Sequence, residues 1–226
     1  MTLSELLIKV PELENYLRYM PEELKTRCTI KTYPPKTIIH QKDAKLDYFG
    51  IVCEGYHRVI NEFENGNVFM IERNDPIDFV GEVAILAGEP RTSVTIETTT
   101  DCTVLYFSRK DFEDWIEKDI HFLRLVSQKV AYKLYRSSYN RGNRLFYPPQ
   151  HLLLLYFLQY IEEYHSCVIR RTREEIHEET GISVKTLNRT IRKLKESGMV
   201  GITKGKVTMD EAQQKMAREY VQDGRE

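Results

Sequence analysis

The chain has 226 residues, of which 41% are hydrophobic and 30% charged, and its formal net charge is −1 at pH 7. This balance is typical of a globular protein and excludes disordered and collagen-like chains. No run of about 18 apolar residues is present, so we expect no membrane helix, and the first residues lack the basic and apolar regions of a secretory signal. The four cysteines fit no CxxC metal or redox spacing. We therefore expect a cytoplasmic protein with reduced, buried cysteines.

Charged residues are unevenly distributed along the chain. Residues 168–206 carry ten basic and five acidic side chains, whereas residues 1–110 carry 13 basic and 17 acidic side chains. One basic stretch in an otherwise neutral or acidic chain indicates a segment that faces nucleic acid, or equally a solvated helix face. The charge pattern alone leaves both interpretations open.

The first half of the chain predicts short helices followed by a β-structure. Pro11 and Pro21 stand where helices can begin within residues 3–27. From residue 29 to 108, β-branched and aromatic stretches alternate with turn residues every 8–12 residues or so, which predicts a small antiparallel barrel or roll. Asn65-Gly66 predicts a two-residue hairpin turn, because this pair supplies the positive φ angles that such a turn needs. The predicted strands are 37–40, 48–52, 57–60, 68–71, 93–96 and 102–107.

A single long helix is predicted from Ser108 to about Phe146, because no proline interrupts this stretch. At about 100° per residue, its side chains form two opposite stripes. One stripe holds Leu123, Val126, Val130, Leu134, Ser137, Arg141 and Leu145, and the other holds Leu125, Tyr132 and Tyr139. A helix that is apolar on two faces must bury both. We expect one face to pack on the roll and the 123–145 stripe to pack on a second copy of the chain; the alternative is one helix buried within one core.

Two stretches are expected to interrupt this helix. They are Asn-Arg-Gly-Asn at 140–143 and Tyr-Pro-Pro at 147–149, because proline removes a helix hydrogen bond and clashes with the preceding turn. We therefore expect a hinge or domain boundary near residues 140–149. The apolar residues from Leu152 to Leu158 predict the core helix of a second small domain.

Residues 172–194 have the pattern of a helix-turn-helix. Thr172 and Glu175 form a capping box, Gly181 ends the short first helix, and Ser183 is a good N-cap for the second helix. Two helices joined by a short glycine-containing turn are typical of this motif. The second helix has an apolar face of Leu187, Ile191 and Leu194 and an opposite face of Lys185, Asn188, Arg189, Arg192 and Lys193.

Residues 199–208 predict a two-stranded basic wing that turns at Lys204-Gly205 and continues with Lys206. Long donor side chains on the second helix suit phosphates and base edges in a major groove. A solvated helix pair would explain the charges, but it would not explain a capped helix pair followed by a Lys-Gly-Lys hairpin. The sequence therefore favours DNA binding.

Residues 79–94 form a second motif, in which Gly81-Glu82 opens a short helical turn and Arg91-Thr92 follows nine residues after Glu82. The backbone N–H groups from Gly81 to Val83, the Arg91 guanidinium and the Thr92 hydroxyl would hold an anion. Glu82, which only accepts hydrogen bonds, would hold a sugar hydroxyl. A structural ion pair between Glu82 and Arg91 explains the same residues.

Gly81-Glu82 and Arg91-Thr92 resemble the phosphate-binding cassette of cyclic-nucleotide-binding domains. Together with the helix-turn-helix, residues 20–210 or so resemble a bacterial transcription regulator of the Crp/Fnr family. The resemblance implies an α+β fold with an antiparallel β-roll (a double-stranded β-helix), a long dimerisation helix and a winged helix-turn-helix. The implied segments are 1–108 (N-terminal helices and effector-binding roll), 109–146 (dimerisation helix and hinge) and 147–226 (DNA-binding domain).

The family resemblance also implies partners. The chain would be a cytoplasmic homodimer that binds a two-fold-related site in double-stranded DNA, with RNA polymerase as a candidate partner and no membrane contact. The candidate effectors are cyclic AMP and other anionic small molecules, and no metal is implied. An enzyme is not expected, because no nucleophile–base pair, metal-ligand spacing or glycine-rich nucleotide loop is present.

Residue roles follow from the same resemblance. In the roll, the backbone of Gly81 and Val83 and the side chains of Arg91 and Thr92 would hold the cyclic phosphate, and Glu82 would accept from the ribose 2′-hydroxyl. Arg136 and the partner subunit's Ser137 would contact the base. In the DNA-binding domain, phosphate contacts would come from Arg173, Ser183 and Thr186, base contacts from Val184, Lys185 and Arg189, and further contacts from Asn188, Lys204 and Lys206.

This sequence departs from the family pattern at several positions. Arg136 is a long cation where cyclic-AMP responders commonly carry a small hydroxyl, and Val184-Lys185 replaces an Arg-Glu pair found in some members, so the operator should differ. Two alternatives remain open: a sensor of haem or another ligand on the same scaffold, with one of six histidines as the haem ligand, and a cyclic-nucleotide module that regulates a partner protein without DNA.

Overall fold

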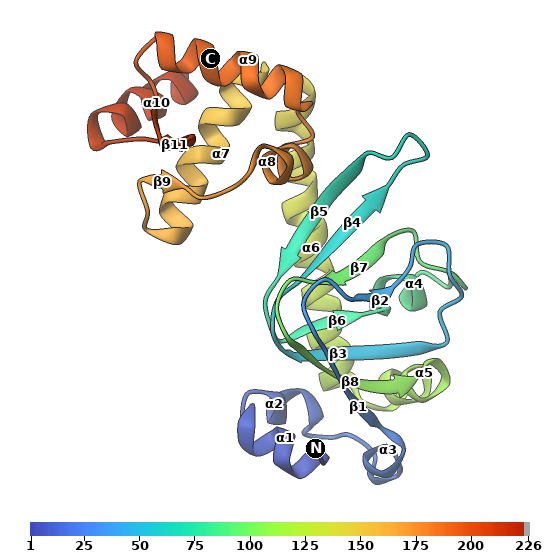
Figure 1. Ribbon diagram of the computed structural model, residues 1–226. Helices are drawn as coiled ribbons and strands as arrows, with labels where there is room; N and C mark the ends of the chain where they lie inside the picture. The colour runs from blue at the N-terminus through green and yellow to red at the C-terminus, as the bar shows by residue number, and fades with distance from the viewer. Residues whose placement is uncertain (224–226) are drawn as a thin grey trace. The chain divides into compact units, whose positions relative to one another are not determined.

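The computed structural model describes residues 1–223, and for residues 139–145 it describes the backbone without the side chains. The chain divides into two compact units, Met1–Arg136 and Ser137–Glu226, which have separate hydrophobic cores (Figure 1). No helix within the described residues is long and apolar enough to cross a membrane.

Three short helices open the first unit, as the sequence predicts. They are α1 (Leu3–Lys9), α2 (Leu13–Leu17) and α3 (Glu22–Arg27). Thr2 and Glu5 form a capping box at the start of α1, and Pro21 stands at the N-cap of α3. Leu6 and Leu13 are fully buried in the core of this unit.

Eight antiparallel strands form a roll of two four-stranded sheets, with the orders β1-β8-β3-β6 and β2-β7-β4-β5. The strands are β1 (Thr29–Tyr33), β2 (Ile38–His40), β3 (Tyr48–Glu54), β4 (His57–Glu62), β5 (Val68–Asn74), β6 (Asp78–Val80), β7 (Thr95–Thr98) and β8 (Cys102–Ser108). Val52 and Val104 of the first sheet pack with Val59 and Ile96 of the second. The predicted antiparallel roll is confirmed, and β1 and β6 lie outside the predicted strands.

The hairpin between β4 and β5 differs from the predicted two-residue turn. The Gly66 N–H donates to the Phe63 carbonyl, and the Phe63 N–H donates to the Asn67 carbonyl, so residues 64–66 form a three-residue loop. Gly66 has a positive φ of 80°, whereas Asn65 does not, and a two-residue type I′ turn needs positive φ at both central positions. Asn65 instead accepts the N–H of Asn67 with its side-chain oxygen at 3.1 Å.

The predicted single helix is two helices, α5 (Arg109–Lys118) and α6 (Ile120–Phe146). The two helices are separated at Asp119, whose two carboxylate oxygens accept hydrogen bonds from α5 and from α6. Its Oδ2 accepts from the Trp115 indole N–H at 3.0 Å, and its Oδ1 accepts from the Phe122 backbone N–H at 3.0 Å. The same side chain therefore ends α5 and caps α6.

The α6 helix continues through residues 140–143, where the sequence predicts an interruption. A glycine inside a helix costs only about 0.5–1 kcal/mol relative to alanine, which explains why Gly142 does not break it. The prolines do end the helical run, since the next helix, α7, begins at Pro149.

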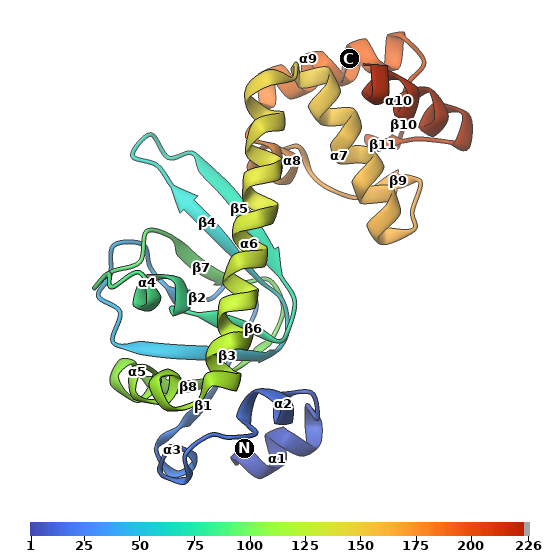
Figure 2. The same ribbon diagram turned by 180° about the vertical axis from the view of Figure 1, so that it is seen from behind.

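One face of α6 packs on the roll of the first unit (Figure 2). Phe122 and Val126 are fully buried in the core, and Lys129 and Lys133 continue the same face at spacings of three and four residues. The prediction that Val126 belongs to the dimer stripe is therefore wrong. The reason is that Val126 lies at the border between the two faces, and the core of its own unit covers it.

The second unit combines four helices of the described chain with a three-stranded sheet of order β10-β11-β9. The elements are α7 (Pro149–Tyr164), β9 (Val168–Ile169), α8 (Arg173–Thr180), α9 (Val184–Glu196), β10 (Gly201–Thr203), β11 (Lys206–Thr208) and α10 (Glu211–Asp223). Leu153 and Phe157 of α7 are fully buried with Leu187 and Leu194 of α9. Cys167, in contrast, is exposed and Cys28 is half-buried, so the expectation that all cysteines are buried is confirmed only for Cys53 and Cys102.

Asp119→Ala should lower the free energy of unfolding by about 2–4 kcal/mol. The change removes a helix N-cap, which costs roughly 0.5–2 kcal/mol, and it leaves the buried Trp115 N–H without an acceptor, which costs about 1–3 kcal/mol. Urea denaturation followed by circular dichroism measures the loss. Asp114→Ala, at an exposed position of α5, is the control, and equal losses for the two variants would contradict the role of Asp119.

Candidate effector site and nucleic-acid surface

The cassette motif begins at a backbone position that requires glycine. Gly81 follows β6, has a φ of 94° and caps α4 (Glu82–Leu86). A Cβ at this position would lie 2.9 Å from the Tyr48 carbonyl oxygen, and a positive φ is costly for other residues. Gly81 therefore lets the chain turn directly from β6 into α4, with Glu82 as the first residue of that helix.

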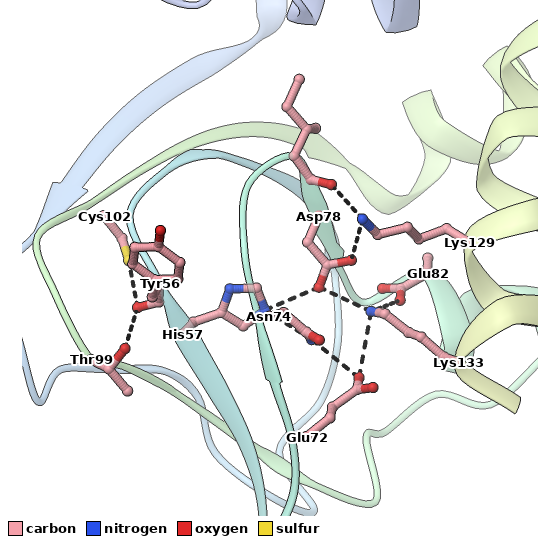
Figure 3. A network of polar contacts seen from close by, with 11 residues as sticks. Tyr56, His57, Glu72, Asn74, Asp78, Glu82, Thr99, Cys102, Lys129 and Lys133 are labelled. Carbon is pink, nitrogen blue, oxygen red and sulfur yellow. Dashed lines mark hydrogen bonds and ion pairs between the residues drawn. The ribbon is translucent and has the colours of Figure 1, made fainter. Parts of the chain in front are cut away.

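Glu82 is paired with a lysine of α6. It is 3% exposed, and its Oε1 accepts from Lys133 Nζ at 3.2 Å (Figure 3). Lys133 Nζ also donates to Asp78 Oδ2 at 3.0 Å. No ion pair joins Glu82 to Arg91 within the described residues, so the alternative interpretation of a structural Glu82–Arg91 pair is wrong. Glu82 pairs with the Lys133 ammonium instead, and the Arg91 guanidinium is exposed.

Arg91 and Thr92 both use their side chains on nearby backbone carbonyls. Arg91 is exposed and donates from Nη1 to the Asp43 carbonyl. Thr92 is buried and donates from Oγ1 to the Val94 carbonyl at 2.9 Å. Both belong to the loop between α4 and β7. To donate to a phosphate, the Thr92 hydroxyl would have to leave the Val94 carbonyl, whereas Arg91 has further N–H groups besides the one on the Asp43 carbonyl.

The remaining predicted effector residues lie at the surface. The Val83 side chain is exposed on α4. Arg136 is exposed, and its guanidinium lies over the Tyr132 ring at 5.9 Å from the centroid. Ser137 is exposed and is the first residue of the second unit. Within the described part of the chain, the α6 residue that reaches the cassette carboxylate is therefore Lys133 and not Arg136.

A buried network surrounds this contact (Figure 3). His57 Nε2 of β4 lies 3.2 Å from Asp78 Oδ2, and both residues are 0% exposed. Burial acts to raise the pKa of Asp78, but the His57 hydrogen bond and the Lys133 charge outweigh it and hold that pKa below its ordinary value. Burial raises the pKa of Glu82. The Lys133 charge acts to lower this pKa, but it offsets the effect of burial only in part.

Lys133 stays charged in this setting. Burial acts to lower the pKa of Lys133, but the charges of Glu82 and Asp78 outweigh burial and raise it above the ordinary value for lysine. Sequence reasoning missed this residue because neither of the two predicted α6 stripes included Lys133. The signal was the 122-126-129-133 spacing, since a lysine continues a buried face with its methylene stem.

A cavity of about 390 Å³ opens elsewhere in the first unit. Its walls include the rings of Tyr33, Tyr48 and Tyr106, with Arg27 and Lys31 among the other lining residues. The Tyr106 and Tyr33 hydroxyls are joined at 3.0 Å. None of the predicted effector residues lines this cavity.

The second unit contains the predicted helix-turn-helix. Thr172 and Glu175 form the capping box of α8, and Gly181 ends α8 with a φ of 72°. Ser183 Oγ accepts from the Thr186 N–H at 3.3 Å and so caps α9. These local interactions are the ones that the sequence predicts, and they fix where α9 begins.

The two faces of α9 differ as predicted. Leu187, Ile191 and Leu194 are buried in the core of the second unit. The opposite face is polar and exposed, with Lys185, Asn188, Arg189, Arg192 and Lys193. Of the other predicted DNA contacts, Ser183 is exposed, and Arg173, Val184 and Thr186 are half-buried.

The predicted wing is also present. β10 pairs with β11, and the turn between them has positive φ at Lys204 (49°) and Gly205 (77°), the conformation of a two-residue hairpin. Lys204 is exposed at the tip. Lys206 is half-buried, and its Nζ donates to the Arg171 carbonyl at 3.3 Å.

Comparison with known proteins agrees with this architecture. Residues 30–119 match the family of cyclic nucleotide-binding domains. The cAMP-activated global transcriptional regulator CRP of Salmonella typhimurium is 25% identical over 182 residues, which cover 77% of this chain and 86% of that protein. The cAMP-activated global transcriptional regulator Vfr of Pseudomonas aeruginosa is 21% identical over 194 residues, covering 82% and 90%.

Solved structures share the fold across most of the chain. The c-di-GMP responsive global regulator CLP of Xanthomonas campestris has a TM-score of 0.74 at 15% identity, covering 88% of this chain and 98% of that one. A protein of Eubacterium rectale assigned to the crp/fnr family has a TM-score of 0.74 at 17% identity, covering 92% and 100%. Residues 30–119 thus match the model of cyclic nucleotide-binding domains, and the chain is similar in sequence and in fold to Crp/Fnr transcription regulators.

Proposed function

We propose that this chain is a homodimeric transcription regulator that binds a two-fold-related operator in double-stranded DNA and responds to a small effector in its β-roll. The observation that carries this proposal is α9, a capped helix with one buried apolar face and one exposed face of cations and an amide. Such a helix fits a major groove, where Arg and Lys donate to guanine and Asn pairs with adenine.

The proposed DNA contacts divide into two kinds. Arg173, Ser183 and Thr186 lie at the N-terminal ends of α8 and α9 or beside them, where side chains and helix N–H groups suit phosphates. Lys185, Asn188 and Arg189 lie on the exposed face of α9 and suit base edges, with Val184 beside them. Lys204 and Lys206 of the wing would add positive charge near the phosphate backbone of the DNA.

The exposed apolar side chains of α6 support the proposed dimer. Leu134 of the 123–145 stripe is 66% exposed, the neighbouring Tyr135 is 72% exposed, and Tyr132 of the opposite stripe is 59% exposed. Several large apolar side chains gathered on one exposed helix mark an interaction surface. In a regulator that recognises a two-fold-related operator, the partner that fits this surface is a second copy of the chain.

The proposed effector site is the cassette of Gly81, Glu82, Val83, Arg91 and Thr92. Relatives with this domain are named for activation by cAMP or response to c-di-GMP, so an anionic small molecule is the proposed class, with cyclic AMP as one candidate. Arg136 and Ser137 stay predicted base contacts, and RNA polymerase stays a candidate partner without an assigned surface.

The histidines favour this proposal over a haem sensor. His57 pairs with Asp78, His40 bonds the Tyr48 hydroxyl at 2.8 Å, and His177 bonds the Ile182 carbonyl at 3.0 Å. Each of these rings has a structural partner. The capped α8–α9 pair with its wing also favours a DNA-binding regulator over a module that acts without DNA.

Arg189→Ala should weaken binding to the preferred operator by about 1–3 kcal/mol and relax base preference at one position. Lys204→Ala should weaken binding to all sequences alike and make the affinity less dependent on salt, because it removes a phosphate-type contact. Fluorescence anisotropy on operator and random duplexes at several salt concentrations measures both effects. The control is Lys215→Ala, an exposed lysine of α10.

The same titrations test the proposal as a whole. Operator half-sites should lie about one helical turn, ~34 Å, apart, because a two-fold dimer presents two α9 helices to one side of the duplex. Equal losses on every sequence for Arg189→Ala would remove this residue from base recognition. Affinity that does not change with salt would contradict DNA binding through this surface.

Leu134→Asp should convert the dimer to monomers, because it would place a charge within the apolar interface between two α6 helices. Sedimentation velocity measures the change in mass. Met216→Asp, at an exposed apolar position of α10, is the control and should leave the mass unchanged. A dimer that persists in the Leu134→Asp variant would show that another surface joins the subunits.

A further inference from the structure

Three carboxylates of the roll converge on one ammonium of α6 (Figure 3). Lys133 Nζ lies 3.0 Å from Asp78 Oδ2, 3.2 Å from Glu82 Oε1 and 3.6 Å from Glu72 Oε1. The three carboxylates come from β6, α4 and β5. One lysine therefore ties three separate elements of the roll to α6.

Burial makes this ammonium necessary to the site. Asp78 is 0% exposed and Glu82 is 3% exposed. Carboxylates removed from water must be paired, because an unpaired buried charge is strongly disfavoured. Lys133 therefore balances the buried negative charge of Asp78 and Glu82.

Two further side chains hold the same arrangement. Lys129, which precedes Lys133 on the same face of α6, donates from Nζ to the Ile77 carbonyl at 2.8 Å. His57 of β4 lies against Asp78 at 3.2 Å. Asp78 is thus fixed from β4 as well as from α6, and α6 has two lysine contacts to the roll that need no effector.

A ribose hydroxyl that reached Glu82 would compete with the ammonium, which already lies 3.2 Å from Oε1. A hydrogen bond between an ammonium and a carboxylate is roughly twice as strong as one between neutral groups. The displaced Lys133 would also leave the buried Asp78 with less compensating charge. Both effects act against any ligand that binds Glu82 through a sugar hydroxyl.

We propose that Lys133 is the resident ligand of Glu82 and a specificity-determining residue of the cassette. Its ammonium takes the place of a ribose hydroxyl, so the roll holds α6 without a cyclic nucleotide and binds cyclic nucleotides weakly. The inference rests on the proposal that the roll is an effector domain, and it narrows the effector to anionic molecules that do not need Glu82 as a hydroxyl acceptor.

Calorimetric titration of the full-length protein with cyclic AMP and cyclic GMP tests this inference. Lys133→Ala frees Glu82 Oε1 and the space beside it, so this variant should bind at least about tenfold more tightly than the parent. Lys133→Arg keeps the cation and should bind as weakly as the parent. Arg124→Ala removes an exposed cation from α6 and is the matched control. Nucleotide affinity for Lys133→Ala no tighter than that of the parent would overturn the proposal.

Hydrogen exchange on the parent protein gives a second measurement that needs no variant. With either nucleotide at millimolar concentration, amide protection of α4 and of residues 120–136 should stay unchanged, because Lys133 remains on Glu82. A loss of protection in residues 120–136 would show that the nucleotide displaces Lys133 from Glu82, and it would overturn the proposal even if Lys133→Ala failed to fold.

These measurements are separate from the test of the proposed function. Nucleotide titration and hydrogen exchange are read without DNA, whereas the Arg189 and Lys204 variants are read without nucleotide. Loss of salt-dependent DNA binding would therefore contradict the regulator proposal alone, and tight binding of cyclic AMP by the parent would contradict the role of Lys133 alone.

Discussion

The first unit depends on the pairing of Lys133 with Asp78 and Glu82. A short strand and a short helix meet at Gly81 and bring two carboxylates into the interior, where they are stable only beside a cation. That cation comes from α6, so the requirement to balance buried charge fixes which face of α6 contacts the roll. Phe122 and Val126 on the same face pack in the apolar core. The polar and the apolar contacts therefore place the same face of α6 against the roll.

Local chemistry made the second unit predictable from the sequence. Thr172, Gly181 and Ser183 each satisfy backbone groups within a few residues of themselves, and Lys204-Gly205 forms its turn without help from other elements. The faces of α9 followed from a period of 3.6 residues. Because each of these rules acts over a short stretch of chain, tertiary packing did not override them. In contrast, α10 was missed, although Asp210 and Gln213 cap its start with a reciprocal pair of hydrogen bonds at 2.8 and 3.0 Å.

Long-range contacts account for most of what the sequence did not show. Asp119 separates α5 from α6 because its carboxylate accepts from the buried Trp115 and from the start of α6 at the same time, and neither partner is evident from helix periodicity. Lys133 was missed for a related reason, since its carboxylate partners lie more than fifty residues earlier in the chain. The family resemblance predicts Glu82 as a hydroxyl acceptor, but a pattern of residues does not show that Lys133 donates to its carboxylate.

An occupied acceptor changes how an effector can act on α6. A ligand shifts a conformational equilibrium only by the difference between its affinities for the two states. A ligand that replaces Lys133 must favour the state in which α6 has lost that anchor, whereas a ligand that binds elsewhere in the roll leaves the anchor in place. The α6 helix is continuous from Ile120 to Phe146. Whether a ligand releases or retains the Lys133 contact would therefore determine how that ligand alters the N-terminal half of α6. If the roll binds an effector as proposed, the chemistry of Glu82 and Lys133, more than the presence of the cassette residues, would decide which small molecules it accepts.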